Sequence, residues 1–154
     1  MGILRTGSAV EPLMRGARPA PGAVTVVRRA TFAAAHVLRR QDWDEGRNRS
    51  VFGACAGEHG HNYVLEVAVR GEPDPETGMV VNLKDVDEVM RSAVIADVDH
   101  RHLNRDVSWL RGVIPTAENL ALAFWARLDD VLPNGALVRV RLVESENNSV
   151  EVGR

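Results

Sequence analysis

The sequence predicts an α+β domain in which two helices cover one face of a four-stranded antiparallel sheet. Two patterns carry this prediction. Segments near both ends of the chain are rich in β-branched residues and alternate apolar with polar side chains, which is the two-residue period of a half-buried strand. Segments between them repeat apolar residues at intervals of three and four, which is the period of an amphipathic helix. The expected order is strand, strand, helix, helix, strand, strand.

The size and composition favour one folded domain. At 154 residues, of which 45% are hydrophobic and 26% are charged, the chain can bury one ordinary core. Residues 1–22 contain glycine, proline and arginine without apolar periodicity, so we expect them to form a flexible extension. We therefore expect the single folded domain to occupy residues 23–154.

The first strand is expected before a long polar loop. Residues 24–35 are mostly β-branched or small, which predicts a strand that ends near His36. Residues 39–50 are polar and predict a loop.

The second strand is expected over residues 59–69. Its odd-numbered positions are apolar or histidine, whereas its even-numbered positions include asparagine, glutamate and arginine. Alternate side chains of a strand share a face. His59 and His61 are therefore expected on the face that packs against the core.

The remaining elements are two helices and two strands. The first helix is expected after Asn82, and the second begins after Thr116 and stops before Pro133-Asn134-Gly135, because these residues favour helix ends. Residues 138–144 and 150–152 are then expected to form strands. In the first of these two strands Val138, Val140, Leu142 and Glu144 share the buried face.

Charge and cysteine content exclude several classes of protein. The formal net charge of −2 gives no basic footprint, so we expect no nucleic-acid partner. The single cysteine, Cys55, cannot form an intrachain disulfide, which is typical of a reducing compartment and favours the cytoplasm. No apolar run approaches the roughly 18 residues of a membrane helix, so we expect no membrane association.

Three histidines are candidate metal ligands. His59 and His61 project to the same side of one strand, and His36 at the end of the preceding strand is placed to add a third nitrogen. Three histidines leave a fourth tetrahedral position open, which is typical of catalytic zinc sites. The alternative interpretation is a solvent-facing pair and a core histidine.

Cys55, Asp99 and His100 are candidate proton-transfer residues. A cation near Cys55 would favour its thiolate, and a carboxylate that orients an imidazole is a common acid/base unit. The alternatives are a buried, inert cysteine and a solvated polar loop.

Three further polar residues carry weaker signals. An inward Glu144 would need a partner, and a ring edge with two parallel N–H donors can bind both of its oxygens. The alternative is that the strand ends before Glu144. Thr116 and Glu118 are explained by helix capping alone.

Seven segments in this order resemble the 6-pyruvoyltetrahydropterin synthase and 6-carboxytetrahydropterin synthase family. The resemblance spans about residues 26–153. The segments are Phe32-Ala-Ala-Ala-His36, Phe52-Gly-Ala-Cys55, His59-Gly-His61-Asn-Tyr, residues 71–83, Asp99-His100, Thr116-Ala-Glu-Asn and Glu144-x-x-Asn-Asn.

The resemblance implies a residue role at each matching position. It implies zinc held by His36, His59 and His61, a catalytic group of Cys55, Asp99 and His100, and a pterin pocket with Glu144, Thr116 and Glu118. It also implies a tunnelling fold, or T-fold, in which several subunits join their sheets into a barrel. The expected assembly is a homohexamer, a dimer of trimers, with active sites at subunit junctions.

The implied activity is that of a zinc-dependent lyase acting on 7,8-dihydroneopterin triphosphate. The short interval from Cys55 to His59 favours 6-carboxy-5,6,7,8-tetrahydropterin as the product, with loss of triphosphate and acetaldehyde. Residues 52–55, 78–83 and 144–148 look more like the 6-pyruvoyl branch, which is the alternative. The downstream use, in a tetrahydrobiopterin-like cofactor, a queuosine-type deazapurine or a secondary metabolite, stays open.

Two interpretations from other classes stay open. One is a zinc hydrolase, which would not need Cys55. The other is a catalytically idle homologue that binds pterin without consuming it. For the lyase, the triphosphate needs cationic partners, and the sequence favours none among Arg28, Arg29, Arg39, Arg40 and Lys84.

Overall fold

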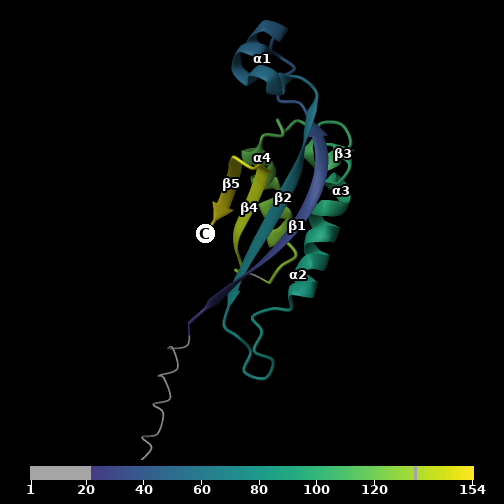
Figure 1. The fold of residues 1–154 in the computed structure, drawn as a ribbon. Coiled ribbons are helices and arrows are strands. Elements are labelled where there is room, and N and C mark those ends of the chain that lie inside the picture. The colour runs from purple at the N-terminus through teal and green to yellow at the C-terminus, as the bar shows by residue number, and fades with distance from the viewer. Residues whose placement is uncertain (1–21, 134) are drawn as a thin grey trace, which may run out of the picture.

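The computed structural model describes residues 22–133 and 135–154. The predicted flexible extension lies outside the described residues, except for its last position. The described part of the chain has α+β architecture, in which one sheet carries helices on one face (Figure 1). No helix in this part is both long and apolar enough to cross a membrane.

The sheet has five strands in the order β3-β1-β2-β4-β5. Its antiparallel strands are β1 (Val24–His36), β2 (His59–Gly71), β4 (Leu137–Ser145) and β5 (Asn148–Gly153). These four match the predicted strands. The fifth, β3 (Arg101–His102), lies parallel to β1 and was not predicted. The predicted four-stranded sheet was therefore incomplete. A strand of two residues is too short to show the alternation by which a strand is predicted.

The two predicted helices occur at the expected positions. The first begins at α2 (Leu83–Met90) and continues through a π-helical turn (Arg91–Ile95) into α3 (Ala96–Val98). The second is α4 (Ala117–Asp129). The predicted caps are also present, because the side chains of Asn82 and Thr116 accept backbone hydrogen bonds from the first turns.

The predicted loop over residues 39–50 was wrong in its second half, because α1 (Glu45–Phe52) is a helix. Asp44 caps this helix by accepting a hydrogen bond from the backbone of Arg47. Within α1 only Asn48 is buried, so the helix has no apolar stripe from which periodicity could reveal it. Figure 1 shows α1 projecting beyond the end of the sheet, and a short 3₁₀ turn (Gly53–Ala56) returns the chain to β2.

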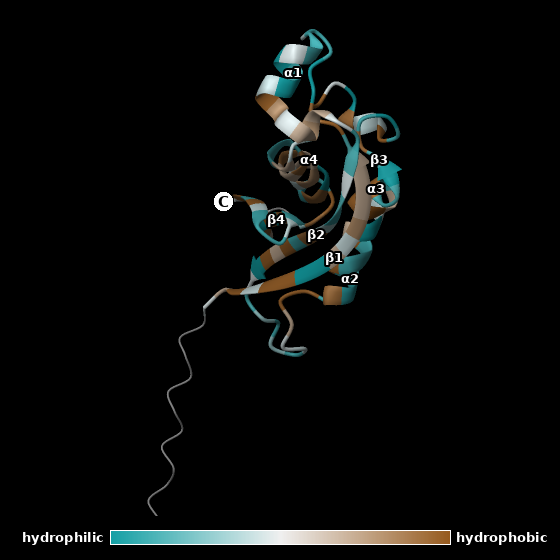
Figure 2. Cartoon of the chain, turned by 45° about the horizontal axis from the view of Figure 1, so that its top comes forward, coloured by the Kyte–Doolittle hydropathy of each residue, from teal (hydrophilic) through white to brown (hydrophobic). Residues whose placement is uncertain are grey.

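The core lies between the sheet and the helices. Figure 2 shows hydrophobic and hydrophilic stretches along β1 and β2, and buried positions recur at every second residue toward the histidine end of β1 and through the middle of β2. Phe32 of β1 stacks on Tyr63 of β2 with ring centroids 4.8 Å apart, and Phe124 of α4 packs edge-on against Phe32. All three are buried, so the strand ends that carry the histidines rest on a packed aromatic cluster.

One predicted core position in β4 was wrong. Val140 and Leu142 are buried as expected, but Leu137 is buried in place of Val138. The pairing of β2 with β4 shifts between Ala68 and Val69, which is a bulge. A bulge inserts one extra residue and moves the preceding side chain to the other face of the sheet.

Asn48 anchors the turn before α1. Its side-chain amide is buried, donates to the carbonyls of Arg40, Trp43 and Asp44, and accepts from the backbone N–H of Arg40. We expect Asn48→Ala to lower the free energy of unfolding by about 2 kcal/mol, because several part-buried hydrogen bonds to the backbone are lost. Urea unfolding measures this change.

The matched control is Ser50→Ala, an exposed position in the same helix, which should leave the unfolding midpoint unchanged. Equal effects of the two substitutions would contradict the anchoring role of Asn48.

Candidate metal centre and active site

The sheet brings the three predicted histidines together. In the antiparallel pairing of β1 with β2, His36 lies opposite His59 and Ala34 lies opposite His61. The ring centroid of His36 is 4.5 Å from that of His59 and 5.1 Å from that of His61. One nitrogen from each ring lies within 4.8 Å of the others. The predicted convergence of the three imidazoles is therefore confirmed.

Backbone carbonyls select the tautomer of two of the rings. The Nδ1–H of His36 donates to the carbonyl of Pro115, and that of His59 donates to the carbonyl of Gly57, each over 2.8 Å. A neutral ring that donates from Nδ1 presents a lone pair on Nε2. These carbonyls therefore orient both rings as ligands, as second-layer partners of metal-binding histidines commonly do.

The arrangement fits a divalent metal ion. The Nε2 atoms of His36, His59 and His61 are buried and have no hydrogen-bond partner in the described residues. Burial lowers the pKa of His36 to about 4, so this ring is neutral at physiological pH. Three converging imidazole nitrogens are a donor set that zinc accepts, with a fourth position open.

Glu144 lies at this centre. Its Oε1 atom is 3.3 Å from Nε2 of His61 and 3.6 Å from Nε2 of His36, and its side chain is 18% exposed. The inward direction predicted for Glu144 is therefore confirmed, although the bulge alters the face assigned to Val138 earlier in the strand. A carboxylate here adds negative charge beside the imidazoles.

Tyr63 supports the centre from the core side and was not predicted as a site residue. Its hydroxyl oxygen lies 3.4 Å from Nδ1 of His36. Burial, and then the charges of Glu144 and Cys55, raise the pKa of Tyr63, so its hydroxyl stays protonated. No separate signal marks Tyr63 in the sequence, because a tyrosine in an apolar alternation is indistinguishable from a core residue.

Cys55 lies in the 3₁₀ turn that precedes β2. Its side chain is half-buried, and its carbonyl accepts a hydrogen bond from the backbone of Leu38 over 2.8 Å. Because Leu38 closely follows His36, this bond ties the cysteine turn to the end of β1.

Asp99 and His100 form the expected pair. The His100 Nδ1–H donates to Asp99 Oδ1 over 2.9 Å, and the backbone N–H of Ala33 donates to the same oxygen over 2.9 Å. Hydrogen bonds from Ala33 and then His100 hold the pKa of Asp99 below its usual range, against the effect of desolvation. His100 also has a positive φ of 57°, which is uncommon for a residue other than glycine.

The pair does not join the histidine cluster within one chain. It is attached to the edge of β1 at Ala33, and the His100 side chain is 82% exposed. In the described residues neither Asp99 nor His100 contacts a candidate metal ligand by a hydrogen bond or ion pair. The imidazole is thus presented to solvent.

Thr116 and Glu118 lie at the start of α4. Thr116 accepts a hydrogen bond from the backbone of Asn119, and Glu118 is exposed in the first helical turn. Thr116 directly follows Pro115, whose carbonyl orients His36. In the described part of the chain neither side chain bonds to Glu144 or to the histidines.

A side-chain contact between Glu58 and His102 was not predicted from the sequence. The Nε2–H of His102 donates to Oε2 of Glu58 over 2.7 Å, and Arg105 pairs with the other oxygen. These contacts, His102 first, hold the pKa of Glu58 below its usual range. They fasten the residue before His59 to the segment that carries His100. The two partners are far apart in sequence, so no local pattern indicates them.

The chain matches known proteins along most of its length. Residues 25–154 match the family model described as 6-pyruvoyl tetrahydropterin synthase. The chain is 42% identical over 127 residues to the 6-pyruvoyl tetrahydrobiopterin synthase of Homo sapiens, covering 81% of this chain and 88% of that protein. It is 34% identical over 100 residues to a putative 6-carboxy-5,6,7,8-tetrahydropterin synthase of Archaeoglobus fulgidus, covering 65% of this chain and 79% of that protein.

A solved structure agrees with the fold. The chain superposes on the 6-pyruvoyl tetrahydropterin synthase of Caenorhabditis elegans with a TM-score of 0.81 and 36% sequence identity. The match covers 86% of this chain and 96% of that chain.

The lowered pKa of His36 predicts that acid destabilises the metal-free protein. Because the folded pKa is about 4 and the ordinary value is 6.5, the unfolded chain binds the proton first as the pH falls. This contribution to stability is complete above pH 6.5 and is lost between pH 6.5 and 4. At roughly 1.4 kcal/mol per pKa unit, the loss is about 3 kcal/mol.

Urea unfolding of the metal-free protein at several pH values between 4 and 7 tests this expectation. The His36→Gln variant removes the titrating ring, so its stability should fall less steeply with acid than that of the wild type. Parallel pH profiles for the two proteins would contradict the assignment.

Proposed function

The chain belongs to the 6-pyruvoyl tetrahydropterin synthase family, and from this premise we propose that it is a zinc-dependent lyase that converts 7,8-dihydroneopterin triphosphate to 6-pyruvoyltetrahydropterin. The observation that carries the proposal is the set of three buried Nε2 atoms that converge without partners in the described residues. A lyase that stabilises negative charge on substrate oxygens needs a cation at such a point.

The proposed product differs from the one that the sequence favoured. The short interval between Cys55 and His59 led to the expectation of a 6-carboxy product. The match to a 6-pyruvoyl tetrahydrobiopterin synthase has the higher identity, 42% against 34% for a putative 6-carboxy enzyme. Its alignment also covers more of the chain. The comparisons therefore favour the alternative, and the 6-carboxy activity is retained as a second candidate because of that interval.

The histidines would hold the metal, and the protein would supply the proton transfers. Zinc bound by His36, His59 and His61 would lower the cost of negative charge on the substrate's side-chain oxygens. Cys55, as a thiolate, would take a proton from the side-chain carbon. The reaction needs no external redox partner, because oxidation of the side chain is balanced by reduction of the ring as triphosphate leaves.

Asp99 and His100 would complete the catalytic group from a neighbouring subunit. Asp99 accepts from Nδ1 of His100, so the ring would exchange protons through Nε2. The ring is exposed and does not bond to the histidine cluster of its own chain in the described residues. A homohexamer built as a dimer of trimers would bring it to an active site at a subunit junction.

Glu144 would recognise the pterin ring. A carboxylate can accept two parallel N–H donors from the ring edge, which favours this ring type. Its position beside His36 and His61 would hold the ring next to the metal-bound side chain. Thr116 and Glu118 stay proposed pocket residues, because they follow the carbonyl that orients His36.

Other proposals follow from the sequence alone. The single cysteine favours a cytoplasmic location, and the low net charge favours a small-molecule substrate over nucleic acid. A 6-pyruvoyl product would supply a tetrahydrobiopterin-type route, whereas a 6-carboxy product would supply a deazapurine route.

The proposed reaction predicts the products of one incubation. Zinc-loaded protein and 7,8-dihydroneopterin triphosphate should give inorganic triphosphate and 6-pyruvoyltetrahydropterin, identified by mass spectrometry. Release of acetaldehyde with 6-carboxytetrahydropterin would move the protein to the second candidate. Unchanged substrate would refute both.

The proposed role of the thiol predicts separate effects on metal and turnover. Cys55→Ala should keep one zinc ion per chain and lower kcat by a factor of about 100 or more, because general-base catalysis contributes at least that much. Metal analysis and steady-state kinetics measure the two effects. A variant that retained turnover would favour a zinc hydrolase instead.

The proposed sharing of sites between subunits predicts complementation. Cys55→Ala chains and His100→Ala chains should each be inactive alone. When the two are co-expressed, mixed oligomers should recover part of the activity, because some junctions receive both intact residues. No recovery in mixed oligomers verified by mass spectrometry would place both residues in one chain's own site.

A further inference from the structure

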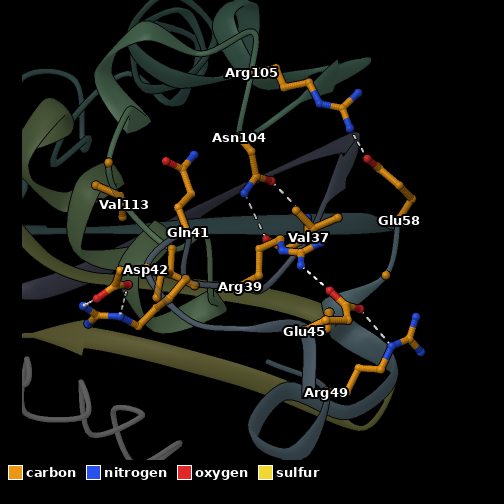
Figure 3. A pocket seen from close by; sticks show the side chains of 15 residues that line it. Val37, Arg39, Gln41, Asp42, Glu45, Arg49, Glu58, Asn104, Arg105 and Val113 are labelled. Atoms are coloured by element: carbon orange, nitrogen blue, oxygen red, sulfur yellow. Dashed lines mark hydrogen bonds and ion pairs between the residues drawn. The ribbon is translucent and has the colours of Figure 1, made fainter. Parts of the chain in front are cut away.

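A large polar hollow lies behind the metal centre, between α1 and the loops that precede α4. It has a volume of about 790 Å³, which is within the range of small-molecule sites. Figure 3 shows Arg39, Arg49 and Arg105 around it, and Arg40 also lines it; these four arginines define what we call the arginine pocket. In the described residues none of these arginines bonds to a candidate metal ligand or to Glu144.

The arginine pocket shares walls with the metal centre. Its lining includes Gly57, whose carbonyl orients His59, and Val37, which directly follows His36. It also includes Ile114, the neighbour of the proline whose carbonyl orients His36. A ligand bound at the histidines and one bound in the pocket would therefore be separated by little more than one layer of backbone.

The arginines are held in place by carboxylates. Glu45 accepts from Arg39 with one oxygen and from Arg49 with the other, as the dashed lines in Figure 3 show. Arg40 pairs with Asp42, and Arg105 pairs with Glu58. The pocket lining thus carries four positive and three negative side chains.

Each guanidinium keeps most of its donors for another partner. A guanidinium has five N–H donors, and the ion pairs engage one nitrogen each of Arg39, Arg49 and Arg105 and two of Arg40. All four arginines are partly exposed. A polyanion with many oxygens could therefore bind several of them at once, which is the geometry in which arginine forms its strongest contacts.

The other cationic candidates are distant from the histidines of their own chain. Arg28 and Arg29 precede His36 by eight and seven residues in β1, so they lie more than about 20 Å away along the strand. Arg28 is paired with Asp87 of α2, and Lys84 begins the same helix. Figure 1 shows the start of α2 at the end of the sheet opposite α1. Within one chain, Arg39 and Arg40 are thus the two of the five candidates that lie near the histidines, and Arg49 and Arg105 line the same pocket.

We propose that the arginine pocket binds the triphosphate group of the substrate, an inference that rests on the proposed function. The phosphate chain begins one carbon beyond the side-chain hydroxyls that the metal would bind, so its site must adjoin the histidines. The arginine pocket meets this condition and has the required charge. Arg39 and Arg49 are the principal ligands, because one carboxylate positions both.

The ion pairs allow a test that distinguishes anion binding by the arginines from a purely structural role. A bound triphosphate competes with Glu45 for Arg39 and Arg49. Glu45→Gln removes the competing charge and should tighten triphosphate binding, whereas an ion-pair network that only stabilised the fold would not bind the anion more tightly after this change.

The test is isothermal titration of the zinc-loaded full-length protein with inorganic tripolyphosphate. The double variant Arg39→Gln/Arg49→Gln should bind it at least about tenfold more weakly, because two charge-assisted contacts are lost. Glu45→Gln should bind it more tightly, and added salt should weaken binding by the wild type. Zinc content is measured after each titration, since tripolyphosphate also chelates metal.

Arg28→Gln is the matched control. Arg28 is also paired with one carboxylate, and its side chain is 40% exposed, as is that of Arg39. This variant should bind tripolyphosphate as the wild type does. Equal weakening by Arg28→Gln, or unchanged binding by the double variant, would overturn the proposal. So would loss of binding only in Arg101→Gln, which alters another hollow, lined by His61 and His100.

Kinetics separate this inference from the proposed function. If the lyase activity is present, the double variant should raise KM for the triphosphate substrate at least about tenfold and change kcat much less. Turnover with an unchanged KM would refute the subsite alone. Absence of turnover in the wild type would refute the function, while the tripolyphosphate titration would still decide whether the arginine pocket binds polyphosphate.

Discussion

The register of β1 against β2 is the constraint on which the metal centre depends. His36, His59 and His61 converge only because His36 lies opposite His59 and the side chains of β2 alternate. A slip of one residue would turn His59 and His61 to the other face of the sheet. Gly60 fits this pairing closely, because a Cβ atom there would lie 2.9 Å from the carbonyl oxygen of Ala34.

Two loops complete the metal centre that the strands position. The carbonyls of Gly57 and Pro115 come from different parts of the chain, yet each receives the Nδ1–H of one histidine. The same loops border the arginine pocket, so the metal centre and the polar hollow share one backbone framework. The buried lone pairs on Nε2 are costly without a partner, and a bound cation would satisfy all three. A bound cation would therefore both stabilise the fold and supply the chemistry of the site.

Features with a local period could be predicted from the sequence, and features that depend on distant contacts could not. The alternation of residues 59–69 placed both histidines with the core, and two capping residues located both predicted helices. The helix α1 was missed because its only buried residue is Asn48, and β3 was missed because it has two residues. The link between Glu58 and His102 and the arginine pocket join segments that no local pattern connects.

The coordination of zinc tests the central claim most directly. X-ray absorption spectroscopy of the zinc-loaded protein measures the number and type of ligands. The account predicts one zinc ion per chain with three imidazole nitrogens at about 2.0–2.1 Å, and no sulfur ligand. A sulfur atom at about 2.3 Å, or fewer than three imidazoles, would contradict a centre built from His36, His59 and His61 alone.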